Sequence, residues 1–277
     1  MGRKPLRYDC IIVGAGISGL SCAKEISAAG LMVLLLESST RIGGRLNTID
    51  LGGNSATPAD IGASFVHGII DNPLTKLSKE VPFKLHLPTE QTTTRVYPHD
   101  AHGEPLKEEV SEKLDFLSFN VTFNRCHEQA QAGPSVPKEE ESVWDVLTST
   151  PAGQGVWRDI EEEDRERVLS LSPMWSGWTG AKLSDVSLKW WGFENEFRGE
   201  DAVVSNGYRQ LIDWTLHQAQ RQGAELICDS KVTKISRQGD DGPFSVFAAS
   251  SDGGEVEFEA DHVVCSVSLG GLASILA

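Results

Sequence analysis

The sequence predicts an α/β fold in which one discontinuous domain, built on a parallel sheet, carries an inserted, mainly helical α+β domain. Strand-like apolar runs alternate with a helical pattern over residues 8–36, and this alternation returns over 204–267. The stretch between them is charged and mostly helical in pattern. We therefore expect residues 1–82 and 204–277 to form the discontinuous domain and residues 83–203 to form the insertion.

The N-terminal elements follow one another as strand, helix and strand. Residues 8–13 (YDCIIV) form an apolar run that stops at Gly14, which is typical of a buried parallel strand. Residues 17–29 have apolar side chains at helical spacing and end at Gly30. A second apolar run, residues 32–36, ends at Glu37. This order predicts the start of a βαβ unit, to be completed by a strand from later in the chain.

The later elements are predicted in the same way. The charged segments 107–130 and 159–171 have helical patterns, and Ser142 is placed to cap a short helix at 143–147. Residues 208–222 predict a helix that Gly223 ends. We expect one long strand or a strand pair over 225–237, a hairpin joining 244–249 to 255–259, and a further buried strand over 262–267.

Composition limits the classes of function. The net charge of −15 would attract cationic partners, and we expect no nucleic acid partner. No apolar run approaches the roughly 20 residues that span a bilayer, so no membrane segment is expected. The five cysteines are widely spaced without a CxxC, which favours reduced thiols and a cytoplasmic protein. His99 and His102 form an HxxH in a loop without further ligands, and we expect no metal site.

The turn after the first strand has the GxGxxG pattern of a dinucleotide site. The first glycine permits the tight turn, the second lets the backbone approach a pyrophosphate, and the third lets the helix pack closely on the strand. Glu37, at the end of the second strand, is placed to accept hydrogen bonds from an adenosine ribose. The pattern predicts a Rossmann-type domain whose cofactor-binding residues are Gly14, Ala15, Gly16, Ile17, Ser18, Gly19 and Glu37.

A second glycine turn distinguishes an FAD site from a nicotinamide dinucleotide site. The segment RIGGR contains Gly43 and Gly44, which permit another close backbone approach, and Arg45, which can make charge-assisted contacts with a diphosphate. A nicotinamide dehydrogenase has no need of a second phosphate clamp directly after the ribose-binding strand. The expected cofactor is therefore FAD.

These motifs resemble the flavin-containing amine oxidases, a group that includes polyamine oxidases, monoamine oxidases and histone-demethylase relatives. The resemblance lies in GAGISGL, LLLES with RIGGR, DIGASFVHG at 60–68, residues 178–208, DSKVTKI at 229–235 and HVVCSVSLG at 262–270. It leans towards polyamine oxidases because of His67 and the WGFE segment.

The resemblance implies further site residues. Gly62, Ala63, Ser64 and Phe65 would run beside the isoalloxazine ring, and Val232 would contact the adenine through its backbone. His67 would be a polar residue of the substrate tunnel, although a packed supporting histidine is an equal alternative. Trp175, Trp178, Trp190 and Trp191 could line that tunnel, but core packing is the favoured interpretation.

The chain also departs from the family pattern. Ser268 stands where relatives have a proline, and the sequence ends at Ala277, so we expect the other catalytic residues and part of both domains to be absent. The resemblance implies an FAD-dependent oxidation of an amine, with a polyamine favoured, to an imine, with oxygen reduced to hydrogen peroxide. Two alternatives remain: a non-catalytic FAD-binding fragment or degenerate paralogue, and a flavin oxidoreductase of the same fold with another substrate. An intact relative could be peroxisomal, and the oligomeric state is open.

Overall fold

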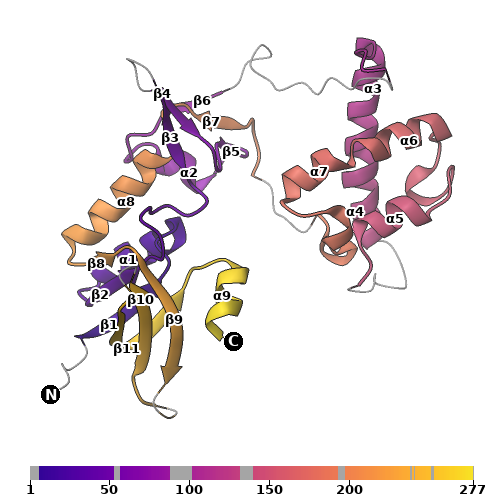
Figure 1. The fold of residues 1–277 in the computed structure, drawn as a ribbon. Helices are drawn as coiled ribbons and strands as arrows, with labels where there is room; N and C mark the ends of the chain where they lie inside the picture. Colours follow the sequence, from indigo (N-terminus) through magenta and orange to yellow (C-terminus); the bar gives the residue numbers. More distant parts are fainter. Residues whose placement is uncertain are drawn as a thin grey trace. The chain divides into compact units, whose positions relative to one another are not determined.

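The computed structural model describes residues 6–52, 57–87, 102–131, 140–192, 197–237, 239, 241–250 and 253–276. The chain divides into two compact units, which we call unit 1 (Met1–Gln91 with Glu196–Ala277) and unit 2 (Thr92–Asn195) (Figure 1). Strand β6 (Leu85–His86) pairs with β7 (Ala202–Val204), and both strands belong to unit 1. The fold is mixed α/β, as the sequence predicts.

Unit 1 is built on a six-stranded sheet with the order β8-β2-β1-β11-β10-β9 (Figure 1). The first four strands run parallel, with Ile11 of β1 opposite Leu34 of β2 and Val263 of β11. β10 is antiparallel to both of its neighbours. The strands are β1 (Leu6–Val13), β2 (Val33–Leu36), β8 (Glu225–Ile227), β9 (Ser230–Arg237), β10 (Phe244–Ser250) and β11 (Glu255–Cys265).

The sheet is covered on both faces, because alternate side chains of β1 enter different cores. Cys10 and Ile12 pack in the cluster that contains residues of helices α1 (Ile17–Ala28) and α8 (Arg209–Arg221). Ile11 and Val13 pack in the other cluster, where Ile275 of helix α9 (Leu269–Leu276) also lies. Both isoleucines are completely buried. Burial on both faces is the reason why the second half of β1, residues 10–13, reads as a continuous apolar run.

Strand β11 differs from expectation. The predicted strands 255–259 and 262–267 are one strand, Glu255–Cys265. Its first half pairs with β10, as the expected hairpin requires, and its second half pairs with β1. Ala260 lies opposite both Tyr8 and Phe244, so the strand passes from one pairing to the other without a break. The part predicted to be buried is only partly so, since His262 and Cys265 are exposed.

Two smaller sheets complete unit 1. β3 (Thr48–Leu51) and β4 (Thr57–Asp60) form an antiparallel pair. β7 lies between β6 and β5 (Phe65–Val66) in a three-stranded antiparallel sheet. The short helix α2 (Pro73–Leu77) follows β5 and is capped by the Asn72 side chain, which accepts a hydrogen bond from the Leu74 N–H.

The described part of unit 2 is mainly helical, and an isolated bridge joins Ser142 to Ser187. Its core contains Trp157, Trp175 and Trp191, whereas the Trp178 and Trp190 side chains are more than half exposed. The packing interpretation therefore holds for two of the four tryptophans that the sequence singled out. The helices are α3 (Glu108–Phe119), a π-helix (Asn120–Arg125), α4 (Cys126–Gln131), α5 (Val143–Ser149), α6 (Glu162–Ser170), α7 (Ser172–Thr179) and three 3₁₀ helices (Gly155–Trp157, Leu183–Asp185, Leu188–Trp190).

The expected cap of α5 is confirmed. The Ser142 hydroxyl accepts a hydrogen bond from the Asp145 N–H at 3.0 Å, and the Asp145 carboxylate accepts one from the Ser142 N–H at 3.0 Å. This reciprocal pair is a capping box. Bonds from the Ser142 backbone and hydroxyl stabilise the carboxylate and lower the pKa of Asp145.

Two other features are absent from the described residues. No helix there combines the length and the apolar character needed to cross a membrane. No three His, Cys, Asp or Glu side chains in those ranges gather as metal ligands could. Of the HxxH pair, His99 lies outside the described residues.

Candidate dinucleotide site

A cavity of about 580 Å³ lies in unit 1 where β1, β2 and β11 end. Val13 and Leu36, the last residues of β1 and β2, line it together with Ser266, which follows β11. The carboxyl ends of parallel strands are where open α/β sheets bind their ligands. The cavity therefore has the position of a ligand site in such a sheet.

The first glycine turn forms one wall. Gly14 has φ +99°, a conformation that favours glycine, and its N–H donates to the Leu36 carbonyl at 2.8 Å. A Cβ on Gly19 would lie 2.1 Å from the Gly14 carbonyl oxygen, so only glycine lets α1 approach the turn this closely. No side chain caps the N-terminus of α1 at Gly16, and Ile17 and Ser18 line the cavity. The backbone N–H groups of this helix end are thus open to an anion.

The second glycine turn lies directly against the first. The Gly43 N–H donates to the Ala15 carbonyl at 2.8 Å, and Gly43 forms an isolated parallel bridge with Gly16. A Cβ on Gly44 would lie 3.3 Å from the Gly16 Cα. Two stretches of bare main chain therefore meet in the cavity wall, and added side chains would fill the space beside them.

Glu37 follows β2 and joins the first glycine turn to the chain after that strand. One carboxylate oxygen accepts a hydrogen bond from the Ala15 N–H at 2.9 Å. The other accepts from the Ser39 N–H at 3.0 Å and from the Ser39 hydroxyl at 3.0 Å. Backbone donors hold the carboxylate on the cavity wall, where its remaining lone pairs can accept further hydrogen bonds.

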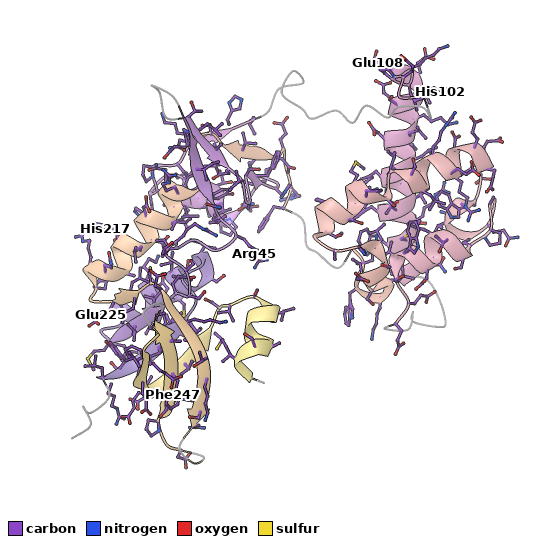
Figure 2. The ribbon with its side chains drawn as sticks, viewed as in Figure 1. Arg45, His102, Glu108, His217, Glu225 and Phe247 are labelled. Atoms are coloured by element: carbon purple, nitrogen blue, oxygen red, sulfur yellow. The ribbon has the colours of Figure 1, made fainter. Side chains whose placement is uncertain are left out.

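The two arginines of RIGGR differ. The Arg41 guanidinium donates to the carbonyls of Gly44 at 3.0 Å and Leu46 at 3.4 Å, and these bonds stabilise the second turn. Arg45 lines the cavity, and its guanidinium has no hydrogen-bond or ion-pair partner among the described residues. Figure 2 shows Arg45 on the segment between the six-stranded sheet and the smaller sheets of unit 1. An unpaired guanidinium beside bare backbone suits a phosphate.

The remaining wall comes from the second half of the chain, and most of it was missed from the sequence. Val232 was expected there, but Lys231 and the residues after β11 were not. The Ser266 hydroxyl donates to the Gly14 carbonyl at 2.9 Å and holds the first turn. Ser268, noted from the sequence only as a departure, caps α9 by accepting from the Gly271 N–H at 3.2 Å. A serine before a helical run signals a cap and could have revealed this helix. The lining residues here are Ser230, Lys231, Val232, Ser266, Val267, Ser268, Gly271, Ser274 and Ile275.

Of the segment 62–65, only Ala63 lines the cavity. Its N–H donates to the Arg45 carbonyl at 3.2 Å, and a Cβ on Gly62 would lie 2.0 Å from that oxygen. The Ser64 carbonyl accepts from the Val204 N–H, and the Phe65 carbonyl accepts from the Tyr208 hydroxyl. The segment therefore runs from the second glycine turn into β5.

His67 lies beyond this segment and does not line the cavity. Its side chain is 70% exposed, and its ring stacks on that of Phe65. Its Nδ1 lies 2.8 Å from an oxygen of Asp201. Burial opposes ionisation of Asp201, but hydrogen bonds from Gly68 and His67 outweigh it and lower the pKa of Asp201.

Comparison with known protein families shows to which family the chain belongs. A model of the family described as flavin containing amine oxidoreductase matches residues 17–277. The chain belongs to this family. It is 28% identical over 272 residues to polyamine oxidase 4 of Oryza sativa subsp. japonica and 29% identical over 274 residues to polyamine oxidase 2 of Arabidopsis thaliana. It is 28% identical over 279 residues to lysine-specific histone demethylase 1 homolog 2 of the same rice.

These alignments cover 94–97% of this amine oxidoreductase chain. They cover 51% of each polyamine oxidase and 33% of the demethylase homologue, so the chain spans about half the length of the polyamine oxidases. FAD is the cofactor that the family implies, and the cavity fits its adenosine diphosphate part. The cradle between Gly16 and Gly44 is one that a Cβ would fill, and it is bounded by a fixed carboxylate and an unpaired guanidinium.

Proposed function

We propose that the cavity of unit 1 binds FAD and that the intact protein oxidises an amine, a polyamine before other amines. The single observation that carries the proposal is the contact between the two glycine turns, with Glu37 fixed beside them by the Ala15 N–H. Two adjacent stretches of bare backbone, a helix N-terminus and an acid together match the paired phosphates and the ribose of a dinucleotide.

In this proposal each part of the cavity has one role. The turn at 14–19 and residues 43–45 hold the diphosphate, with Arg45 supplying positive charge. Glu37 accepts hydrogen bonds from the adenosine ribose, and Val232 contacts the adenine through its backbone. Gly62, Ala63, Ser64 and Phe65 run towards the flavin ring, and His67 contacts the amine beyond it.

Bound FAD would supply the redox chemistry by accepting a hydride equivalent from the amine, giving an imine, and by passing the electrons to oxygen to give hydrogen peroxide. The chain's own residues bind and orient the cofactor and the amine. The uncapped end of α1 and the two turns hold the anionic cofactor, and the buried strands behind them keep that frame rigid. His67 offers the amine a hydrogen-bonding ring at an exposed position.

Three observations support an amine of the polyamine class. The chain carries a net charge of −15, which favours encounter with a polycation. Two of the relatives named above are polyamine oxidases. The described part of unit 2 has exposed aromatic side chains, Phe116 and Trp178 among them, that are suited to line a path for an alkylamine. We accordingly propose that unit 2 is part of a substrate-binding domain.

A second candidate is an FAD-binding protein without turnover. This candidate is supported by the cavity lining, because each lining residue among those described belongs to unit 1 and none comes from unit 2. The two candidates share the first step and differ only after it.

The experiment titrates FAD into the purified full chain and follows flavin fluorescence and absorption. We expect saturable binding, weakened about tenfold or more in Glu37→Gln because charged hydrogen bonds to the ribose are lost. Glu257→Gln, an exposed carboxylate on β11, is the matched control and should bind as wild type does. A folded protein that ignores FAD contradicts both candidates.

Peroxide release then separates the two candidates. Peroxide from spermine supports polyamine oxidation. Peroxide only from a peptide with monomethyl-lysine would indicate that the substrate is a methylated lysine side chain and not a polyamine. Bound FAD without peroxide from either amine supports the second candidate.

A further inference from the structure

The antiparallel pairing of β5 with β7 brings His67 and Asp201 together, although 134 residues separate them in sequence. Phe65 lies opposite Val203 and Val66 opposite Ala202, so His67 and Asp201 face each other just beyond the last pair. A Cβ on Gly68 would lie 2.0 Å from the Phe197 carbonyl oxygen. Glycine at this position therefore permits the close approach of the two chain segments.

One carboxylate serves two donors here. An Asp201 oxygen lies 2.8 Å from Nδ1 of His67, and the other accepts the Gly68 N–H at 2.9 Å. An ionised carboxylate only accepts hydrogen bonds, so Nδ1 must carry the hydrogen. In the neutral ring Nε2 is then an acceptor, and it has no hydrogen-bond partner within the described ranges.

Three contacts restrain a histidine whose side chain is mostly exposed. Its ring stacks on Phe65 with centroids 5.6 Å apart. Its carbonyl accepts a hydrogen bond from the Asn72 side chain at 3.1 Å, and Asn72 itself is buried. Asp201 fixes the remaining freedom, the identity of the ring nitrogen that bears the hydrogen. Restraint of this kind serves a group that must present one atom in one direction.

We propose that Asp201 is a positioning residue that holds His67 in the Nδ1–H tautomer, so that Nε2 accepts a hydrogen bond from an N–H of the amine. The inference rests on the proposed function, because His67 must meet an amine for its orientation to matter. Asp201 does not line the cavity of unit 1, and in this proposal it acts only through His67.

The variant Asp201→Asn separates a positioning role from a purely structural one, in which Asp201 only holds the segment after β5 to the segment before β7. The amide oxygen of Asn can still accept the Gly68 N–H, so this structural hydrogen bond is kept. Its NH₂ group faces Nδ1 and can only donate, so the hydrogen moves to Nε2, which then cannot accept from an amine. Asp71→Asn is the matched control: it removes one exposed carboxylate nearby, and Asn tolerates the φ of +63° at that position.

The test is long-range ¹H–¹⁵N NMR of the full chain with FAD added and histidines ¹⁵N-labelled, at about pH 8.5, well above the ordinary histidine pKa of about 6.5. The His67 signals are assigned by their loss in His67→Gln. We expect the Nδ1–H tautomer in wild type and Asp71→Asn, and the Nε2–H tautomer in Asp201→Asn. On titration with spermine, the wild-type Nε2 signal should shift, and Asp201→Asn should need about fivefold more spermine or greater.

Two results overturn the inference. One is an unchanged tautomer in Asp201→Asn. The other is a changed tautomer with the same spermine response as wild type, including no response in either protein. The proposed function fails in different measurements, the FAD titration and the peroxide assay, so the two failures are distinguishable.

Discussion

The cavity of unit 1 and the core of unit 2 are built in opposite ways. The cavity depends on positions without a side chain, since Gly16, Gly19 and Gly44 let main chain contact main chain. The core of unit 2 depends on large buried side chains such as Trp157, which is completely buried. The comparison teaches that adding atoms should damage unit 1, whereas removing atoms should damage unit 2.

The largest expected effect is in unit 2. Trp157→Ala removes a fully buried indole and leaves the Leu147 carbonyl without its 2.9 Å hydrogen bond. We expect a loss of about 4 kcal/mol in the free energy of unfolding. Urea denaturation followed by near-ultraviolet circular dichroism measures it. Trp190→Ala, at a side chain 55% exposed, should cost no more than about 1 kcal/mol. If only unit 1 binds FAD, Trp157→Ala should leave the FAD affinity unchanged under conditions where it is folded.

A somewhat smaller loss is expected from an added methyl group in unit 1. In Gly19→Ala the new Cβ would meet the Gly14 carbonyl oxygen at 2.1 Å, so α1 must move away from β1. We expect about 3 kcal/mol of destabilisation together with loss of FAD binding. Gly177→Ala in α7 meets nothing within 4 Å and should stabilise by about 0.5–1 kcal/mol. If Gly19→Ala and Gly177→Ala changed the free energy of unfolding equally, this difference between the two units would be contradicted.

Arg45→Ala removes charge from the cavity without adding bulk. We expect FAD to bind about tenfold more weakly, because a charged hydrogen bond to the diphosphate is lost. The deficit should shrink as salt is raised, since salt screens exposed charges. FAD titrations at two ionic strengths measure both effects. Arg7→Ala, which removes an exposed ion pair with Asp261, should bind FAD as wild type does, and an equal deficit there would contradict the role of Arg45.

The cap of α5 tests a local effect within unit 2. Ser142→Ala removes the hydroxyl that accepts the Asp145 N–H, and we expect a loss of about 1 kcal/mol. Urea denaturation measures it. Ser274→Ala, at an exposed position in α9, serves as the comparison and should change the stability by no more than about 0.5 kcal/mol.

The smallest effect is a dependence on pH. Because the pKa of Asp145 is lowered in the folded state, its contribution is present above the ordinary value of 3.8 and is lost as pH falls through the folded value. Asp145→Asn should therefore be less stable than wild type at neutral pH, and the difference should vanish under acid conditions. A difference that grew in acid would contradict the assigned cap. Denaturation at a series of pH values measures it.

Local patterns in the sequence predicted the parts of the site that lie close together in the chain. GxGxxG places Gly14, Gly16 and Gly19 around one turn because their roles depend on backbone conformation over six residues. Glu37 could be assigned because it ends the strand next to that turn. The cap at Ser142 is a contact over three residues and was predicted for the same reason.

Other features could not be predicted because their partners are distant in sequence. Ser266 holds the Gly14 carbonyl across 252 residues. The two predicted strands at 255–267 are one because β1 and β10 both pair with it, and neither pairing is visible in the local pattern.

The sequence by itself determined the α/β class, the two glycine turns and the acid between them, because each is a property of a few neighbouring residues and their backbone. Only the tertiary structure decided that the two turns touch, that α9 lines the cavity, and that Asp201 reaches His67. The physical reason is that these contacts depend on strand order and register. Both are fixed by burial on the two faces of the sheet rather than by any single stretch of chain.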